Sequence, residues 1–182
     1  TISDQQGCTA VEQMALVAPK KMQFTLGTVP TRCYDSPDGS ATILSVTGGS
    51  PTYTYLWDNN ANNQITETAV DLKNGTYLVT VQDAMGCKKD TFLKVGRPSM
   101  VELERFDLKS GLCDGDTLGQ ATAFAKGGTP PYQFLWSNGK TSATATGLKS
   151  GFVTVTITEF FNCSAIASSE LRSLAKLEAT LT

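Results

Sequence analysis

The sequence of 182 residues contains no histidine. Catalytic triads and Cys-His dyads, zinc sites ligated by histidine and histidine proton relays are therefore excluded within this chain. An enzyme would have to work with carboxylates, Lys, Tyr or Ser. A hydrolase built on carboxylates needs two acidic residues that converge across one cleft, and the sequence offers no such pair outside turns. We therefore expect a protein that is not an enzyme.

An excess of positive charge is also missing, because 15 Lys and Arg stand against 17 Asp and Glu. Nucleic acids and anionic membrane surfaces need a basic patch, so neither is expected as a partner. No apolar run approaches the length of about 18 residues that indicates a membrane span. The opening residues, TISDQQGC, lack the charged and apolar regions of a signal peptide. We expect the chain to be a piece of a longer protein.

The sequence repeats itself after nearly 80 residues. The stretch GGSPTYTYLW at 48–57 returns as GGTPPYQFLW at 127–136, and LKNGTYLVTVQDAMGC at 72–87 returns as LKSGFVTVTITEFFNC at 148–163. Between these stretches the offset falls from 79 to 76 residues, which places a three-residue deletion between the Trp and the Leu. A repeat of this kind indicates tandem modules. The expected boundaries are a C-terminal hairpin of a preceding module at 1–19, complete modules at 20–98 and 99–174, and the first strand of a following module at 175–182.

Each module is expected to be β throughout. Short segments rich in β-branched and aromatic residues alternate with Gly, Asn, Asp and Pro clusters, at the spacing of a β-sandwich. Tight turns are predicted at the SDQQGC and QDAMGC stretches, where Gly7 and Gly86 adopt positive φ easily and Asn162 takes the same place in the second module. A helix at 168–176 competes weakly with a strand. About 80 residues with seven or so strands per module predict an all-β fold of tandem immunoglobulin-like β-sandwiches.

The recurring motifs resemble those of the SprB repeat. They are a Cys, then Asp-Gly-Ser, then Gly-Gly-x-Pro-x-Tyr-x-Tyr-x-Trp, and finally Leu-x-x-Gly-x-Tyr-x-Val-x-Val-x-Asp-x-x-Gly-Cys. The similarity covers nearly the whole chain. The second module departs from it at 152–153, at Glu159 and at Asn162, which are conservative changes for a strand and a turn.

This resemblance implies a function, because SprB repeats typify very large surface adhesins of gliding bacteria of the Bacteroidetes group. It implies export by the type IX secretion route, exposure outside the outer membrane, and adhesion to a substratum during gliding. The expected partners are neighbouring repeats, a polysaccharide or substratum surface, and the gliding and secretion machinery through other parts of the parent protein. The alternative is a carbohydrate-binding module of a secreted multidomain protein.

Two rows of aromatic side chains distinguish the alternatives. Residues at i, i+2 and i+4 of a strand point the same way. We expect each row to form the aromatic spine of a sandwich core, whereas exposed rows would form a stacking platform for sugar rings. The rows are Tyr53, Tyr55 and Trp57 in the first module and Tyr132, Phe134 and Trp136 in the second.

The five cysteines include no CxxC pair, which favours disulfides in an oxidising compartment over a metal site or a redox motif. We expect pairs within modules, Cys33 with Cys87 and Cys113 with Cys163, which leave only Cys8 without a partner. The alternative is a staple between neighbours that joins Cys33 to Cys163. An intramodule bond would require Cys33 to be carried back along the sheet, because the two turns lie at opposite poles of a sandwich.

The turns contain candidate residues for calcium binding and for O-glycosylation. Clustered carboxylates after the first Cys of each module could hold calcium, although ordinary turn residues are the simpler interpretation, and no cofactor is expected. The O-glycan pattern Asp-Thr-aliphatic, which the resemblance implies, marks Thr117, again against an ordinary turn threonine. The clustered carboxylates are Asp35, Asp38, Asp114 and Asp116.

Overall fold

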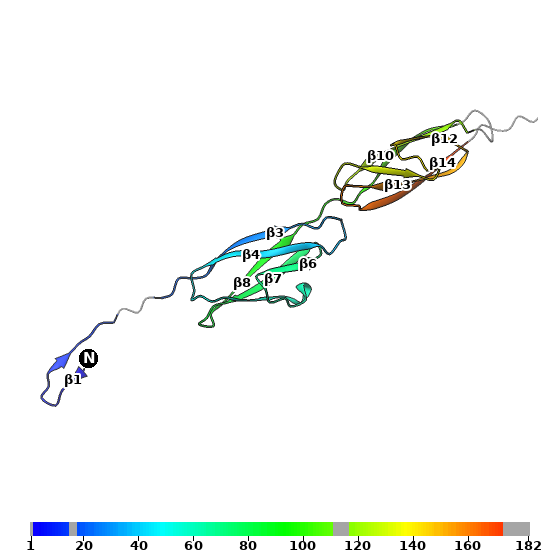
Figure 1. Cartoon of the computed structure of the whole chain (residues 1–182). Helices are drawn as coiled ribbons and strands as arrows, with labels where there is room; N and C mark the ends of the chain where they lie inside the picture. Colours follow the sequence, from blue (N-terminus) through cyan, green and yellow to red (C-terminus); the bar gives the residue numbers. More distant parts are fainter. Residues whose placement is uncertain (1, 15–17, 111–116, 173–182) are drawn as a thin grey trace, which may run out of the picture.

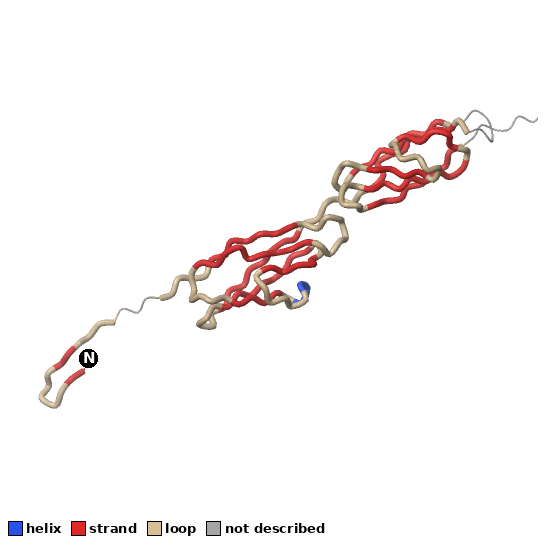
Figure 2. Tube along the Cα trace, viewed as in Figure 1, coloured by secondary structure: helices blue, strands red, loops and turns tan. Residues whose placement is uncertain are grey.

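The computed structural model describes residues 2–14, 18–110 and 117–172. Figure 1 shows two similar β-sandwich units that follow one another end to end. A two-stranded hairpin of β1 (Ile2–Ser3) and β2 (Thr9–Ala10) precedes them in the sequence. Nearly all regular structure in the described residues is strand, as the red segments of Figure 2 show. No helix in the described part of the chain is long and apolar enough to cross a membrane.

The first unit, module 1, consists of two antiparallel sheets of three strands. In the first sheet β4 lies between β3 and β6, and in the second β7 lies between β5 and β8. The strands are β3 (Gln23–Val29), β4 (Gly39–Thr47), β5 (Thr54–Trp57), β6 (Thr68–Leu72), β7 (Gly75–Gln82) and β8 (Lys88–Val95).

The second unit, module 2, repeats this topology, with β10 between β9 and β12 and with β13 between β11 and β14. Each unit thus has six strands in the described residues, rather than the seven or so expected. The all-β, tandem immunoglobulin-like fold is confirmed. The strands are β9 (Glu102–Lys109), β10 (Gly119–Lys126), β11 (Gln133–Trp136), β12 (Thr144–Leu148), β13 (Gly151–Thr158) and β14 (Ser164–Leu171).

The core of each module lies between its two sheets, because alternate side chains of the central strands point inward. In β7, Tyr77, Val79 and Val81 are buried, and the residues between them are half-buried. The corresponding residues of β13 are Val153, Val155 and Ile157, which are also buried. The period-2 pattern of the sequence therefore builds two separate hydrophobic cores, one for each module.

The local predictions on turns are confirmed. Gly7, Gly86 and Asn162 have φ values of 84°, 83° and 65°, so the turn residue takes the left-handed conformation in all three copies. The weak helix prediction is wrong for residues 168–171, which continue β14. Residues 173–182, which include the expected first strand of a following module, lie outside the described residues. The proposed boundaries between modules stay a prediction.

Candidate functional site at the inter-module junction

Each module begins at an N-terminal pole, which we define as the linker before its first strand, its Gly-Gly turn and the turn between its last two strands. At module 1 the carboxylate of Asp83 accepts hydrogen bonds from the backbone N–H groups of Met85 at 3.0 Å and Cys87 at 2.8 Å, and from Ser50 at 3.0 Å. The Ser50 N–H is the largest cause that lowers the pKa of Asp83, against an opposing effect of burial. One buried carboxylate therefore ties two loops together.

The N-terminal pole of module 2 repeats this arrangement with a longer side chain. Glu159 is 3% exposed and accepts from the backbone N–H groups of Phe161 at 2.9 Å, Cys163 at 3.0 Å and Thr129 at 3.0 Å. In the β1–β2 hairpin, Asp4 likewise accepts from the N–H groups of Gln6 and Cys8. An acidic residue four positions before a cysteine thus folds the same turn three times.

The Gly-Gly turn holds the linker that enters each module. The N–H of Gly49 donates to the carbonyl of Lys20 at 2.7 Å, and the N–H of Gly128 donates to the carbonyl of Ser99 at 2.9 Å. Gly48 has a φ of 77°, and a Cβ there would stand 2.4 Å from the carbonyl oxygen of Lys21. A side chain at this position would push the linker away, which explains the glycines of the motif.

Each module ends at a C-terminal pole, which presents the loop of residues 30–38 in module 1. The N–H of Thr31 donates to the carbonyl of Gly96 at 3.0 Å and holds this loop beside the linker to module 2. Within the loop, Asp38 accepts from the Ser36 hydroxyl at 2.6 Å and pairs with Arg32 at 2.7 Å. The Ser36 hydroxyl and the backbone and side-chain N–H groups of Arg32 lower the pKa of Asp38 to about 2. This network fixes the loop that carries Cys33.

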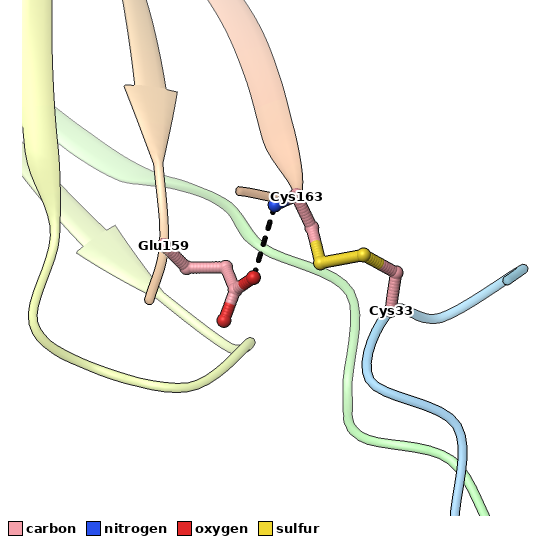
Figure 3. A group of neighbouring side chains, drawn as sticks. All are labelled: Cys33, Glu159 and Cys163. Atoms are coloured by element: carbon pink, nitrogen blue, oxygen red, sulfur yellow. Dashed lines mark hydrogen bonds between the residues drawn. A yellow bond between two sulfur atoms is a disulfide. The ribbon is translucent and has the colours of Figure 1, made fainter. Parts of the chain in front are cut away.

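A disulfide joins the two poles at the junction. Cys33 of module 1 is bonded to Cys163 of module 2, with the Cα atoms 5.8 Å apart, within the range that disulfides require. Figure 3 shows the bond beside Glu159, whose carboxylate accepts from the N–H of Cys163. The carboxylate turn thus positions the half-cystine that receives the neighbouring module.

The expected pairing of Cys33 with Cys87, and with it that of Cys163 with Cys113, is therefore wrong. Cys87 directly precedes β8 at the N-terminal pole of module 1, whereas Cys33 lies in the loop between β3 and β4 at the C-terminal pole. A strand of eight residues such as β8 spans about 25 Å, far beyond the Cα separation of about 7 Å that a disulfide tolerates. The loop of residues 30–38 stays at its own pole instead of returning along the sheet. Cys8 and Cys87 are free and exposed, and Cys113 lies outside the described residues.

The linker between the modules adds a second contact to the junction. The guanidinium of Arg97 stacks on the ring of Tyr34 at 3.5 Å, donates to its hydroxyl at 2.6 Å, and lies 3.8 Å from the carboxylate of Asp35. A cavity of about 170 Å³ remains between residues 32–35 of module 1 and the N-terminal pole of module 2. The junction is thus built from a covalent bond, a stacked cation and a shared surface.

The structure places both aromatic rows in or against the cores. Trp57 is 1% exposed and its indole N–H donates to the carbonyl of Thr66 at 2.8 Å, while Trp136 is 2% exposed and donates to Ser142 at 2.8 Å. Rings buried between two sheets present no face for stacking a sugar. The remaining members of the rows, Tyr53, Tyr55, Tyr132 and Phe134, are half-buried and pack against the cores.

The candidate ion and glycan sites are dispersed. Asp38 faces Arg32 and Ser36, and the side chain of Asp35 is 84% exposed. Thr117 is exposed, whereas Asp114 and Asp116 lie outside the described residues. Cys33, Glu159 and Cys163 bring three possible ligand atoms within 4.8 Å of one another. The sulfur atoms of Cys33 and Cys163 are bonded to each other, so these residues offer no thiolate to a metal ion.

The SprB repeat family model matches residues 25–62 and 107–141, which is one stretch in each module. This chain carries two SprB repeats. Each match begins in the first strand of a module and ends close after its tryptophan. The SprB repeats and the immunoglobulin-like fold support a non-catalytic repeat segment of an adhesin-like surface protein.

No curated protein matches the chain. Solved structures similar to it include a C-terminal 282-residue fragment of intimin in complex with the intimin-binding domain of the translocated intimin receptor, at 15% identity and a TM-score of 0.41. That match covers 85% of this chain and 64% of the intimin fragment. The IG1 and IG2 domains of DIP-gamma match at 9% identity and a TM-score of 0.38, over 85% of this chain and 98% of that one.

The sequence did not lead us to expect that buried carboxylates hold the turns of the N-terminal poles together. A signal was present, because Asp4, Asp83 and Glu159 each stand four residues before a cysteine. Only the structure shows that the second oxygen of Asp83 and Glu159 accepts from the Gly-Gly turn. The acidic residue, the glycine pair and the linker thus adjoin one another at each N-terminal pole, and at module 2 the preceding module is bonded there.

Proposed function

We propose that this chain is a tension-bearing stretch of the stalk of a large exported adhesin, and that the adhesin serves gliding motility and surface attachment. The proposal includes export by the type IX route and exposure outside the outer membrane, with the substratum or a surface polysaccharide as the contacted material. The SprB repeats support the family-level part. The disulfide between Cys33 and Cys163 carries the mechanical part, because it links successive repeats rather than two strands of one repeat.

A tension applied along the chain takes a short route through this bond. It enters along β3, reaches Cys33, crosses the disulfide to Cys163 and leaves along β14. Strands β4 to β13 lie between the two cysteines and are bypassed. The cysteines are 130 residues apart, so the bond withholds about 450 Å of extended chain from stretching. The stalk keeps its length even where a repeat unfolds.

Single-molecule stretching of the whole chain from its two ends tests this role. We expect the oxidised chain to show almost none of the lengthening that accompanies unfolding of the two repeats. After reduction, the same chain should lengthen by about 450 Å more. The Cys33→Ser variant should lengthen without reductant, whereas Cys87→Ser, the matched control, should behave like the unaltered chain. Equal lengthening of the oxidised and reduced chains would contradict the mechanical proposal.

The part of the proposal that concerns gliding needs a test in cells. The Cys33→Ser substitution in the parent protein should leave surface display unchanged and should release cells from a substratum at a lower shear stress. Antibodies raised against this chain should slow gliding if the stalk is displayed and moves along the cell. Unaltered gliding, with antibody visibly bound to the surface, would contradict the role in gliding. The role in surface attachment would not be affected by that result.

A further inference from the structure

The N-terminal pole of module 1 has the same construction as the pole that receives a neighbouring loop at module 2. Its cavity of about 320 Å³ is lined by Pro19, Lys20, Met22, Gly49, Asp83 and Cys87, among others. The cavity at module 2 is lined by Pro98, Ser99, Val101, Gly128 and Cys163, together with residues 32–35 of module 1. The two sets match in register, at an offset of 79 in the linker and the Gly-Gly turn and 76 at the cysteine.

The cysteines at these two poles are held in the same way but differ in their bonding. The N–H of Cys87 donates to Asp83 and the N–H of Cys163 donates to Glu159, at 2.8 and 3.0 Å. Cys163 is bonded to Cys33, whereas Cys87 is an exposed thiol next to the larger cavity. One molecule thus contains both an occupied and an open form of the same docking surface.

The charge around the open pole indicates what it would accept. Lys20, Lys21 and Lys88 are exposed around this pole and Lys89 is half-buried. The corresponding residues at module 2 are Ser99, Met100, Ser164 and Ala165, which carry no side-chain charge. A lysine-rich pole attracts an acidic segment. The cysteine loops of this chain have a net negative charge, because Asp35 and Asp38 outweigh Arg32 around Cys33, and Asp114 and Asp116 follow Cys113.

We propose that the N-terminal pole of module 1 is a docking site for the cysteine loop of another SprB repeat, and that Cys87 forms a disulfide with that loop. The two thiols form one S–S bond and lose two protons and two electrons to a disulfide oxidant, which is reduced to its dithiol. With Cys33–Cys163 repeating the pattern one module later, every junction of an array would carry a staple. The stalk would then be cross-linked along its whole length.

A peptide with the sequence of residues 31–38, TRCYDSPD, tests the docking site directly. Its cysteine is supplied as a mixed disulfide with an aromatic thiol, so that attack by a protein thiolate forms the new S–S bond and expels the aromatic thiolate. The protein is the full chain with Cys33–Cys163 intact and with Cys113→Ser, and mass spectrometry of its fragments locates the product. We expect coupling at Cys87 to be about tenfold faster than at Cys8, because docking raises the local concentration of the peptide.

Cys8 is a matched internal control, because it lies in the same kind of turn, is also exposed, and has only a two-stranded hairpin around it. A peptide with the same residues in scrambled order controls for intrinsic thiol reactivity. Its ratio of rates at Cys87 and Cys8 measures the difference in thiol reactivity and in general charge attraction, and the ordered peptide should exceed that ratio several-fold. Equal rates of the ordered and scrambled peptides at Cys87 would overturn the proposal.

The Lys88→Glu variant tests the preference for an acidic loop. It should reduce the advantage of the ordered over the scrambled peptide at Cys87 several-fold at low salt, and added salt should narrow the difference between the variant and the unaltered chain. Because both peptides react with the same thiol, a change in the reactivity of that thiol cancels in the ratio of their rates. An unchanged ratio in Lys88→Glu would contradict the acidic-loop assignment.

Discussion

Modules 1 and 2 reach the same tryptophan environment through loops of different length. In module 1 the segment after Trp57 forms a 3-10 turn, Asn59–Ala61, which the side chain of Asp58 caps. In module 2 it is three residues shorter and turns at Gly139, which has a φ of 80°. In both, the indole N–H donates to a carbonyl at the end of the loop. The loop path varies, and the hydrogen bond of the buried ring is kept.

The N-terminal poles differ less than these loops, although their carboxylates differ by a methylene group. Asp83 and Glu159 each accept from two N–H groups of their own turn and one of the Gly-Gly turn. The pole has two tasks, since it holds the entering linker and presents a cysteine. A surface that contacts another module tolerates less change in geometry than a loop that faces solvent.

Removal of the Cys33–Cys163 bond should have the largest effect, because the bond closes a loop across 130 residues. In the chain-entropy model a cross-link of that span stabilises the folded chain by about 5 kcal/mol when both modules unfold. We expect Cys33→Ser and Cys163→Ser to lower the free energy of unfolding equally, in urea denaturation followed by tryptophan fluorescence. Cys87→Ser should leave it unchanged. A similar loss in Cys87→Ser would show that the pole, and not the bond, is the source of the stability.

Truncation of a buried tryptophan should have the next largest effect on stability. Truncation of a fully buried Trp costs about 3–5 kcal/mol, so Trp57→Ala should unfold module 1 at much lower urea than module 2, and Trp136→Ala should do the reverse. In the reduced chain, the tryptophan that remains reports on the unaltered module, and circular dichroism reports on both. A loss below about 1 kcal/mol, together with lost binding to a polysaccharide array, would support the carbohydrate-binding alternative.

The carboxylate turn gives a smaller and more specific effect. Glu159→Ala leaves three backbone N–H groups without their acceptor and should destabilise module 2 by roughly 2 kcal/mol. Glu159→Asp copies the residue of module 1 and should cost much less. Trp136 fluorescence in urea measures both variants. Equal losses in Glu159→Ala and Glu159→Asp would mean that the two poles are not interchangeable.

Much of the fold followed from the sequence because its signals are local. The repeat, the glycine and asparagine turns and the alternation in β7 and β13 all arise from residues close together in the chain. The three-residue deletion also falls where predicted, between Trp136 and β12. These features need no knowledge of how distant segments meet.

The partner of Cys33 could not be predicted in the same way. Its choice depends on the hydrogen bond from Thr31 to Gly96, which keeps the loop of residues 30–38 beside the linker, and on the carboxylate of Glu159, which positions Cys163. The hydrogen bond from Thr31 joins residues that are 96 − 31 = 65 positions apart, and the disulfide itself joins two modules. The two pairings therefore differ only in tertiary geometry, although the separation of the poles already disfavoured a bond within one module.

Acid should lower the stability of module 1 slightly more than that of module 2. The pKa of Asp38 is lowered from 3.8 to about 2 by hydrogen bonds from Ser36 and Arg32, whereas the corresponding residue of module 2 is Leu118. A lowered folded pKa means that the stabilisation is complete above pH 3.8 and is lost as the pH falls toward 2. The unfolding midpoint of module 1, followed by Trp57 fluorescence in a Trp136→Phe chain, should therefore fall in this range. Asp38→Asn should make the unfolding midpoint less dependent on pH in this range. Some dependence should remain, because the pKa of Asp83 is lowered as well. If the unfolding midpoint depended on pH in the same way in Asp38→Asn and in the unaltered chain, the loop network would not contribute to the stability of module 1.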